Sequence, residues 1–263
     1  FYATSKALQS AIHTEYSRVE NKAEHLNKAK QALDDAFLAI DSLRYPEIHA
    51  YICLTGGNLY LQLATVENRE ANIRRAIDYF ENITDLLEFD DNPDYYCKAM
   101  MGISGVICYE ARFEKREKHL RDALGYLEKA AQKISFEEYP STFCAIHVRM
   151  AEIYNLLAHI RNRAGNAHIA LEHLEIVDEF INSRPQSRLF MNQNTQYGIA
   201  YWNLSFESDT LANAQKALEV TERTLECCDY TRYELYYGYA LHNLGEIQRH
   251  VARVTDSKKN LNE

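Results

Sequence analysis

A repeat of 47 residues constrains the fold of this 263-residue chain more than any other feature of its sequence. Pro46, Pro93 and Pro140 are separated by this step, and continuing it leads to Ser187 and Glu234. A second column of the repeat contains only alanine, at positions 29, 76, 123, 170 and 217. Chains with such a period build one structural unit per repeat and bury the apolar faces of the units against their neighbours.

Three more columns keep the same character from repeat to repeat. The first column is apolar and contains Leu26, Ile73, Leu120, Ala167, Ala214 and Leu261. The second contains the large apolar residues Leu33, Phe80, Leu127 and Leu174. The third contains the small residues Ser10, Gly57, Ser104, Ala151, Gly198 and Gly245. None of these columns needs an insertion or a gap. The repeat divides the chain into a partial unit, 1–45, four full units, 46–92, 93–139, 140–186 and 187–233, and a truncated last unit, 234–263. In this last unit the second helix is expected to begin at residues 259–261.

Each unit is predicted to hold two helices. The first begins at the proline, whose missing N–H has no partner in a first turn anyway, and Asn92 is a plausible capping residue before Pro93. A glycine in the middle of this helix costs about 1 kcal/mol relative to alanine, so we expect the paired helix to approach it closely. In the second helix, an alanine followed four residues later by a large apolar residue, as in Ala76 and Phe80, marks one buried face.

Composition and charge narrow the class of the protein. Four prolines and nine glycines are too few for an all-β chain with frequent turns. A net charge of −9 disfavours nucleic acids and anionic membranes as partners, because the strongest basic cluster, Lys115 to Arg121, is interleaved with glutamates and indicates a solvated helix face. No apolar run approaches the ~20 residues of a membrane span, and the first residues lack a signal-peptide core. The spacing of the six cysteines fits neither a zinc ribbon nor a disulfide framework, which favours a soluble protein in the reducing cytoplasm.

The repeat positions resemble those of the tetratricopeptide family. The small residue of the first helix is often followed three residues later by tyrosine, at positions 60, 154 and 201, and the alanine of the second helix is followed seven residues later by Ala130 or Val177. The sequences Pro-Glu-x-x-Ala at 46–50 and Asn-Leu-Gly at 243–245 are similar to long-repeat members of this family. The resemblance covers essentially the whole chain and implies an all-α fold, a right-handed α-solenoid of tandem antiparallel helix pairs.

In such a superhelix the first helices line a concave groove, and the resemblance places the groove-facing positions before and after the small residue. These positions are rich in amides and tyrosine and include the single tryptophan; such side chains hold peptide backbones or anchor partners. The groove set comprises Tyr51, Asn58, Gln62, Lys98, Tyr109, Arg149, Glu152, Asn155, Asn192, Gln196, Trp202, Asn203, Tyr239, His242, Asn243, Glu246 and Arg249. Packing between long first helices is an alternative role for some of them. The basic members are isolated from one another, so they do not reproduce the family's clamp for a peptide carboxylate.

Motifs that carry chemistry are few. His168 and His173 lie five residues apart, a poor spacing for sharing a metal, and no His-Glu-x-x-His occurs. Cys97 and Cys144 align with Ala50 and are expected to be small packing residues, whereas the pair at 227 and 228 is expected to be fortuitous rather than redox-active. No phosphate-binding loop and no nucleophile elbow is present. We therefore expect no catalytic residues, no metal and no cofactor.

These observations favour a non-catalytic protein–protein interaction module, a scaffold or adaptor that binds a peptide or a protein in the groove. The alternative is a regulatory or sensor segment of a larger signalling protein, since long repeats of this kind resemble those joined to CHAT proteases and signal-transduction ATPases. An enzyme that uses Cys227, Cys228 or the histidines is a third, weaker hypothesis. Neither end shows a polar cap, so we expect either sequence beyond the ends or self-association through them.

Overall fold

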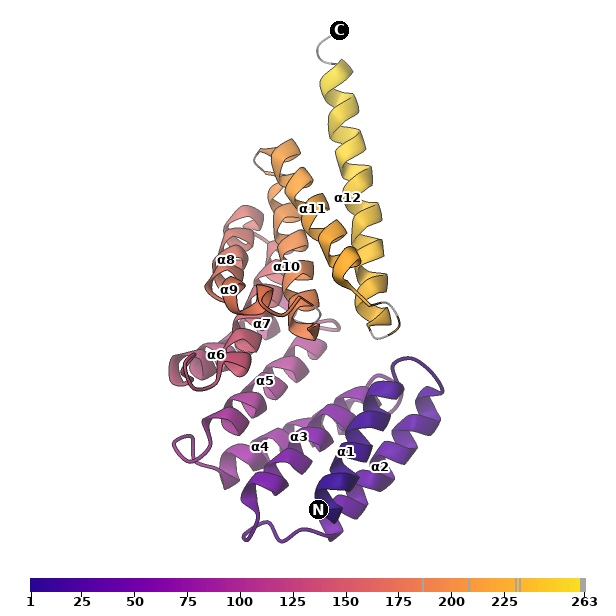
Figure 1. Cartoon of the computed structure of the whole chain (residues 1–263), viewed down its shortest axis with the longest axis vertical. Coiled ribbons are helices and arrows are strands. Elements are labelled where there is room, and N and C mark those ends of the chain that lie inside the picture. The colour runs from indigo at the N-terminus through magenta and orange to yellow at the C-terminus, as the bar shows by residue number, and fades with distance from the viewer. Residues whose placement is uncertain (186, 208, 230, 232, 261–263) are drawn as a thin grey trace. The chain divides into compact units, whose positions relative to one another are not determined.

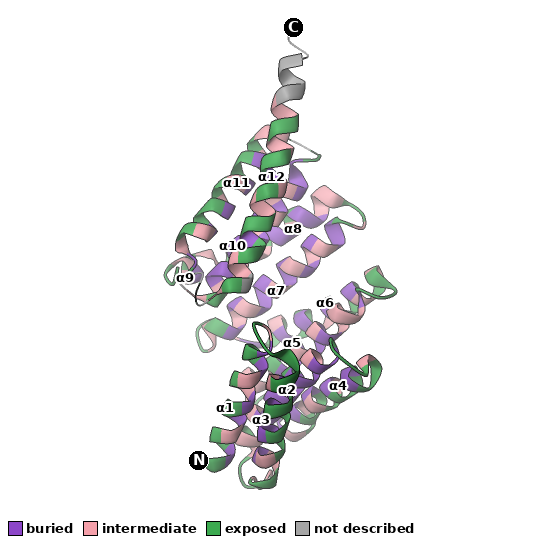
Figure 2. Ribbon diagram, turned by 90° about the vertical axis from the view of Figure 1, so that its right-hand side faces the viewer, coloured by how far each residue is buried: buried purple, intermediate pink, exposed green. Residues whose placement is uncertain are grey.

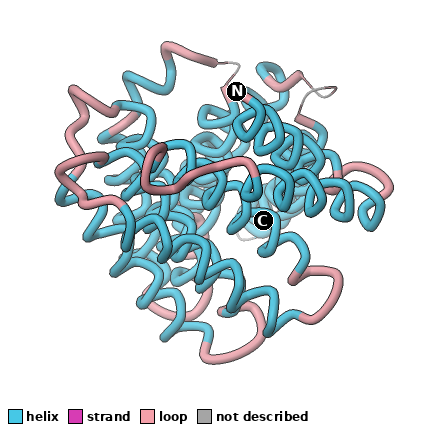
Figure 3. The backbone as a smooth tube through the Cα atoms, turned by 90° about the horizontal axis from the view of Figure 1, so that it is seen from below, coloured by secondary structure: helices cyan, strands magenta, loops and turns pink. Residues whose placement is uncertain are grey.

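The computed structural model describes residues 1–185, 187–207, 209–229, 231 and 233–260. All regular secondary structure among these residues is helical, and short connections join the helices (Figure 3). The expected all-α fold of tandem helix pairs is confirmed. The chain divides into two compact units, Phe1–Ile134 and Ser135–Glu263.

The first unit contains three helix pairs (Figure 1). They are α1 (Tyr2–Tyr16) with α2 (Lys22–Leu38), α3 (Pro46–Leu63) with α4 (Arg69–Leu86), and α5 (Pro93–Glu110) with α6 (Arg116–Lys133). The helix α3 also packs on both α1 and α2, and α5 packs on both α3 and α4. Each pair therefore covers the first helix of the next pair.

The second unit repeats this pattern and then departs from it. The helix α7 (Pro140–Ala158) pairs with α8 (Arg163–Ile176), and α10 (Arg188–Leu204) pairs with α11 (Thr210–Cys227). A break at Val177 separates α8 from the short helix α9 (Asp178–Asn182), so the second helix of this repeat is interrupted. The last helix, α12 (Glu234–Asn260), packs on α10 and α11.

The expected start of a new helix at residues 259–261 is wrong as far as the structure describes them. Instead α12 continues without interruption for 27 residues to Asn260, and Leu261 lies outside the described residues. A turn that requires a left-handed residue costs about 1 kcal/mol or more, whereas continuing the helix does not carry this cost.

The starts of the first helices follow the proline column, as predicted. The helices α3, α5 and α7 begin at the three prolines, α10 begins directly after Ser187, and α12 begins at Glu234. Asn92 caps α5, because the backbone N–H of Tyr95 donates to its Oδ1 at 3.2 Å. Ser187 does the same for α10, accepting from the N–H of Phe190 at 3.1 Å. A capping hydroxyl thus replaces proline in the fourth repeat.

The starts of the second helices are set by a column that the sequence analysis missed. One residue before each of them adopts a left-handed conformation, with φ between 40° and 48°: Asn21, Asn68, Lys115, Asn162 and Asp209. These positions are again 47 residues apart. Asparagine and aspartate tolerate this conformation better than other side chains do, which is the signal that the sequence carried.

The columns predicted to be buried form the core of both units. All five alanines of the alanine column are 0% exposed, and Leu33, Phe80, Leu127 and Leu174 are at most 1% exposed. In Figure 2 buried positions (purple) are frequent along helices such as α7, whereas most described positions of α12 are exposed or intermediate. The 3.6-residue period therefore identified the packed faces correctly.

The close approach expected at the glycines is confirmed at two positions. A Cβ at Gly57 would lie 2.4 Å from the ring of Phe80, and a Cβ at Gly198 would lie 2.9 Å from the hydroxyl of Thr221. Gly102 on α5 meets the same Phe80 ring, also at 2.4 Å. At Gly245 the expectation is wrong, since no atom lies within 4 Å, because no second helix packs on this face of α12 within the described residues.

Candidate functional site

All members of the groove set lie on the helix that begins their repeat unit. Five belong to the first unit, on α3 and α5, and twelve belong to the second unit, on α7, α10 and α12. Each unit is therefore considered by itself. A single groove that runs through both units stays a prediction.

In the first unit the groove set is partly used for packing. The hydroxyl of Tyr109 donates to the backbone carbonyl of Ala64 at the end of α3, at 3.1 Å. Tyr51 and Gln62 are half-buried, whereas Asn58 and Lys98 are exposed. The ammonium of Lys98 pairs with Asp94 one turn earlier, at 2.5 Å.

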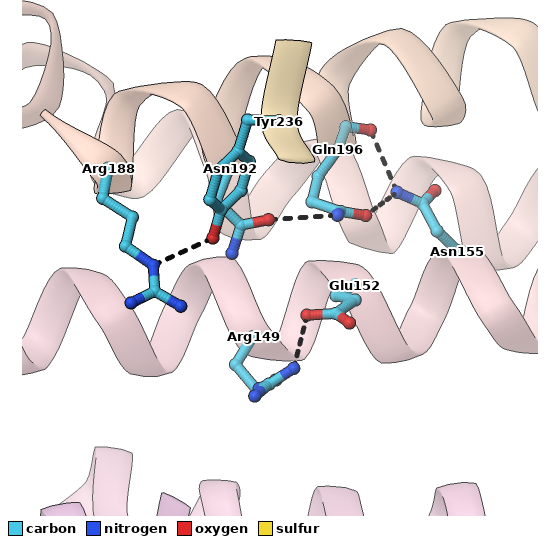
Figure 4. A network of polar contacts seen from close by, with 7 residues as sticks. All are labelled: Arg149, Glu152, Asn155, Arg188, Asn192, Gln196 and Tyr236. Carbon is cyan, nitrogen blue, oxygen red and sulfur yellow. Dashed lines mark hydrogen bonds and ion pairs between the residues drawn. The ribbon is translucent and has the colours of Figure 1, made fainter. Parts of the chain in front are cut away.

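In the second unit an amide network joins α7 to α10 (Figure 4). The Nδ2 of Asn155 donates to the backbone carbonyl of Gln196 at 2.9 Å and to its Oε1 at 3.1 Å, and the Nε2 of Gln196 donates to the Oδ1 of Asn192 at 3.3 Å. Asn155 and Gln196 are 2% and 5% exposed. These two members of the groove set therefore hold two helices together.

The basic members of the groove set are each paired with a carboxylate on their own helix. Arg149 donates to Glu152 at 2.7 Å, and Arg249 pairs with Glu246 one turn away. The guanidinium of Arg188, which is not in the set, donates to the hydroxyl of Tyr236 at 3.1 Å (Figure 4). Lys98, Arg149 and Arg249 thus each form a solvent-exposed ion pair within one helix.

A cleft of about 150 Å³ lies between α10, α12 and the end of α7. We call it the Trp202 cleft, and it is lined by His159, Gly198, Ile199, Trp202, His242, Asn243, Glu246 and Ile247. Four of these residues belong to the groove set, namely Trp202, His242, Asn243 and Glu246. The other four were not predicted, because they line the cleft through the packing of α12 on α10, which the repeat pattern does not specify.

Aromatic neighbours surround the indole of Trp202. The ring of Phe206 meets it edge-on with centroids 5.3 Å apart, and the imidazole of His159 lies 6.0 Å away. Phe206 in turn packs against His250 at 4.3 Å and lies under the guanidinium of Arg163 at 4.8 Å. These contacts fix one side of the indole, while Trp202 remains only partly buried.

Several polar groups on α7 and α10 are buried without a hydrogen-bond partner among the described residues. They are the indole N–H of Trp202, both amide atoms of Asn203, which is 1% exposed, and the Oδ1 of Asn155. An unsatisfied buried donor or acceptor costs about 1–3 kcal/mol, so such groups are uncommon in proteins. All three residues belong to the groove set and lie on α7 or α10.

The buried cysteines are packing residues, as expected for Cys97 and Cys144, which are both 0% exposed. Burial raises the pKa of the Cys53 and Cys97 thiols to about 12 and that of Cys144 to about 11. Burial also raises the pKa of Cys228, the second member of the vicinal pair. These thiols are protonated near neutral pH and are poor nucleophiles.

A histidine pair that the sequence analysis missed connects α7 to α8. The Nδ1 atoms of His147 and His173 lie 3.1 Å apart, so one ring donates to the other. Burial lowers the pKa of His147 to about 4, with the neighbouring His173 as a second cause, and burial also lowers the pKa of His173. His168, five residues before His173, is exposed on α8.

In the described part of the chain, no group of three or more histidine, cysteine or acidic side chains is placed to hold a metal ion. None of the described helices combines the length and the apolar character that crossing a membrane requires. No family model matches the sequence, and no curated protein is significantly similar to it. The resemblance to tetratricopeptide repeats therefore stays a prediction.

Proposed function

We propose that this chain is a non-catalytic protein–protein interaction module of the tetratricopeptide kind, acting in the cytoplasm, and that it binds a peptide segment of a partner protein in the Trp202 cleft. The observation that carries the proposal is the composition of this cleft. It combines an apolar part, Ile199 and Ile247, with the only tryptophan of the chain and with amide, imidazole and carboxylate groups. Binding sites typically pair an apolar surface with a few polar groups that fix orientation.

The residue types in the cleft suit a peptide better than a reacting substrate. Tryptophan is enriched among the residues that dominate binding energy, and the Asn243 amide both donates and accepts hydrogen bonds, as a peptide backbone does. The residues that line the cleft include no serine, threonine or cysteine to act as a nucleophile.

The test is selection of peptides from a random library displayed on phage, using the immobilised chain as bait. Selected peptides are then synthesised with a fluorescent label, and their dissociation constants are measured by fluorescence polarisation. We expect Trp202→Ala to weaken binding at least about tenfold, the effect of losing one anchor residue. Asn243→Ala, at a half-buried position on α12, is expected to weaken binding less.

The matched control is Leu38→Ala, which removes an 88% exposed apolar side chain in the other unit. It is expected to leave binding unchanged, and circular dichroism checks that every variant is folded. Selected peptides that bind wild type and both cleft variants equally would place the site elsewhere. Failure to select any peptide above background would contradict the proposed function.

A further inference from the structure

We infer that the Trp202 cleft selects a single benzene-sized apolar side chain, of the leucine or phenylalanine kind, from an internal position of the peptide rather than from its C-terminus. The inference rests on the proposed function and adds the chemical class of the ligand. Three features of the cleft carry it: its size, the Asn243 amide in its lining and the sign of its charge.

The size of the cleft limits its occupant to one side chain. A protein cavity of about 150 Å³ with apolar walls is large enough for benzene, and the Trp202 cleft has this volume. Its apolar lining comes from Ile199, Ile247 and the face of Trp202, and Ile247 is 2% exposed. One branched aliphatic or phenyl group therefore fills the cleft, whereas a helix or two neighbouring side chains exceed it.

The polar groups at the cleft favour the peptide bonds on either side of that side chain. The Asn243 side chain lines the cleft, and its amide carries both a donor and an acceptor. The Asn243 amide can receive a backbone N–H and donate to a carbonyl at the same time. A capped amino acid with an amide on each side therefore matches both the donor and the acceptor of Asn243.

The charge of the cleft disfavours a terminal carboxylate. Apart from the two imidazoles, Glu246 is the only ionisable residue among the eight that line it. Its partner Arg249 lies one turn further along α12 and does not line the cleft. A carboxylate on the ligand would lie near the Glu246 carboxylate in a partly desolvated site, where like charges repel more strongly than in water.

The experiment uses the single tryptophan as its reporter, because a ¹⁵N-labelled chain gives one indole N–H signal in an ¹H–¹⁵N NMR spectrum. The probes are N-acetyl-L-leucinamide, N-acetyl-L-phenylalaninamide, N-acetylglycinamide and N-acetyl-L-leucine with a free carboxylate, each titrated to millimolar concentration. We expect the leucine and phenylalanine amides to shift the signal saturably and glycinamide to leave it unmoved. The free acid is expected to bind about tenfold more weakly than the amide.

A charge-neutral variant tests the role of Glu246 directly. In Glu246→Gln, the ratio of the dissociation constants of the free acid and the leucine amide is expected to fall to about twofold or less. The matched control is Glu222→Gln on α11, which removes an exposed carboxylate of the same unit that does not line the cleft, and it is expected to leave this ratio unchanged.

The outcomes separate this inference from the proposed function. If N-acetylglycinamide binds the wild type as tightly as the leucine amide does, or if the free acid does so, the inferred ligand class is wrong. If phage-selected peptides shift the indole signal but no capped apolar amino acid does, the chain binds peptides and the inferred side chain is wrong. If neither the probes nor any library peptide binds, both the inference and the proposed function fail.

Discussion

At the scale of single residues, the contact between Phe80 and two glycines provides the sharpest test of the packing. The Phe80 ring lies where a Cβ on either Gly57 or Gly102 would approach to 2.4 Å. Gly57→Ala is therefore expected to lower the free energy of unfolding by about 1–3 kcal/mol, although alanine is the better helix former. Urea unfolding followed by circular dichroism measures the change. In the double variant Gly57→Ala/Phe80→Leu a smaller side chain replaces the ring, so part of the lost unfolding free energy should be recovered. Leucine suits this position, since Leu33, Leu127 and Leu174 occupy it in other repeats.

A glycine without neighbours supplies the control for this prediction. Gly125 lies inside α6, and a Cβ added there would meet no atom within 4 Å. Gly125→Ala is expected to raise the free energy of unfolding by about 0.5–1 kcal/mol, the ordinary gain from replacing glycine in a helix. Equal gains from Gly57→Ala and Gly125→Ala would show that the Phe80 contact is absent.

Lys115 is the exception among the residues that precede the second helices. Its backbone φ is 43°, a conformation that asparagine or aspartate adopts at the four equivalent positions. Lys115→Asn is expected to stabilise the chain by about 0.5–1 kcal/mol, because asparagine tolerates the left-handed region with less strain. The reciprocal change Asn68→Lys should cost a similar amount, and thermal unfolding measures both. A stability that does not respond to either substitution would argue against strain at this column.

At the scale of helices, the pair formed by His147 on α7 and His173 on α8 makes the stability of the second unit depend on pH. The folded state lowers the pKa of His147 to about 4, whereas an unfolded chain binds the proton near pH 6.5. The unfolded state therefore holds more protons between these values. Stability is full above about pH 7 and falls as the pH decreases toward 4. We expect protonation of His147 to lower the free energy of unfolding by about 2 kcal/mol when the pH falls from 7.5 to 5.

A repeat-derived variant isolates this contribution from other titrating groups. Position 100 is equivalent to position 147 one repeat earlier and holds methionine, which is 8% exposed, like His147. In His147→Met, the loss of unfolding free energy from pH 7.5 to 5 is expected to be smaller than in the wild type by roughly that 2 kcal/mol. If wild type and variant lose the same amount, the histidine pair does not destabilise the fold at acidic pH.

At the scale of the whole molecule, the sequence predicted the elements better than the contacts between them. Local chemistry sets the helix starts, since proline, Asn92 and Ser187 act within one turn, so a repeat of 47 residues places them correctly. The cleft depends on how closely α10, α12 and α7 approach, which no local pattern records. The groove set therefore mixes residues that line the cleft, such as Trp202, with others that join helices, such as Asn155. Burial by a neighbouring helix decides between these roles.

The exposed face of α1 leads to a prediction of self-association. Leu8, Ile12 and Tyr16 lie four residues apart on this helix and are 52%, 45% and 52% exposed. The equivalent residues of α3, at positions 55, 59 and 63, are at most 7% exposed, and α3 packs on both helices of the preceding pair. The same face is therefore apolar and uncovered on α1, and two copies can pair through it symmetrically, with Leu8 of each copy against Tyr16 of the other.

We expect the weight-average mass in sedimentation velocity to rise with concentration in the wild type and to remain that of the monomer in Ile12→Lys. Placing a charge in the centre of this stripe opposes pairing but costs little in the monomer, because the side chain is already in solvent. Leu38→Lys, which adds the same charge at an 88% exposed site on α2, should associate like the wild type. Identical behaviour of Ile12→Lys and the wild type would rule out α1 as the surface through which copies meet.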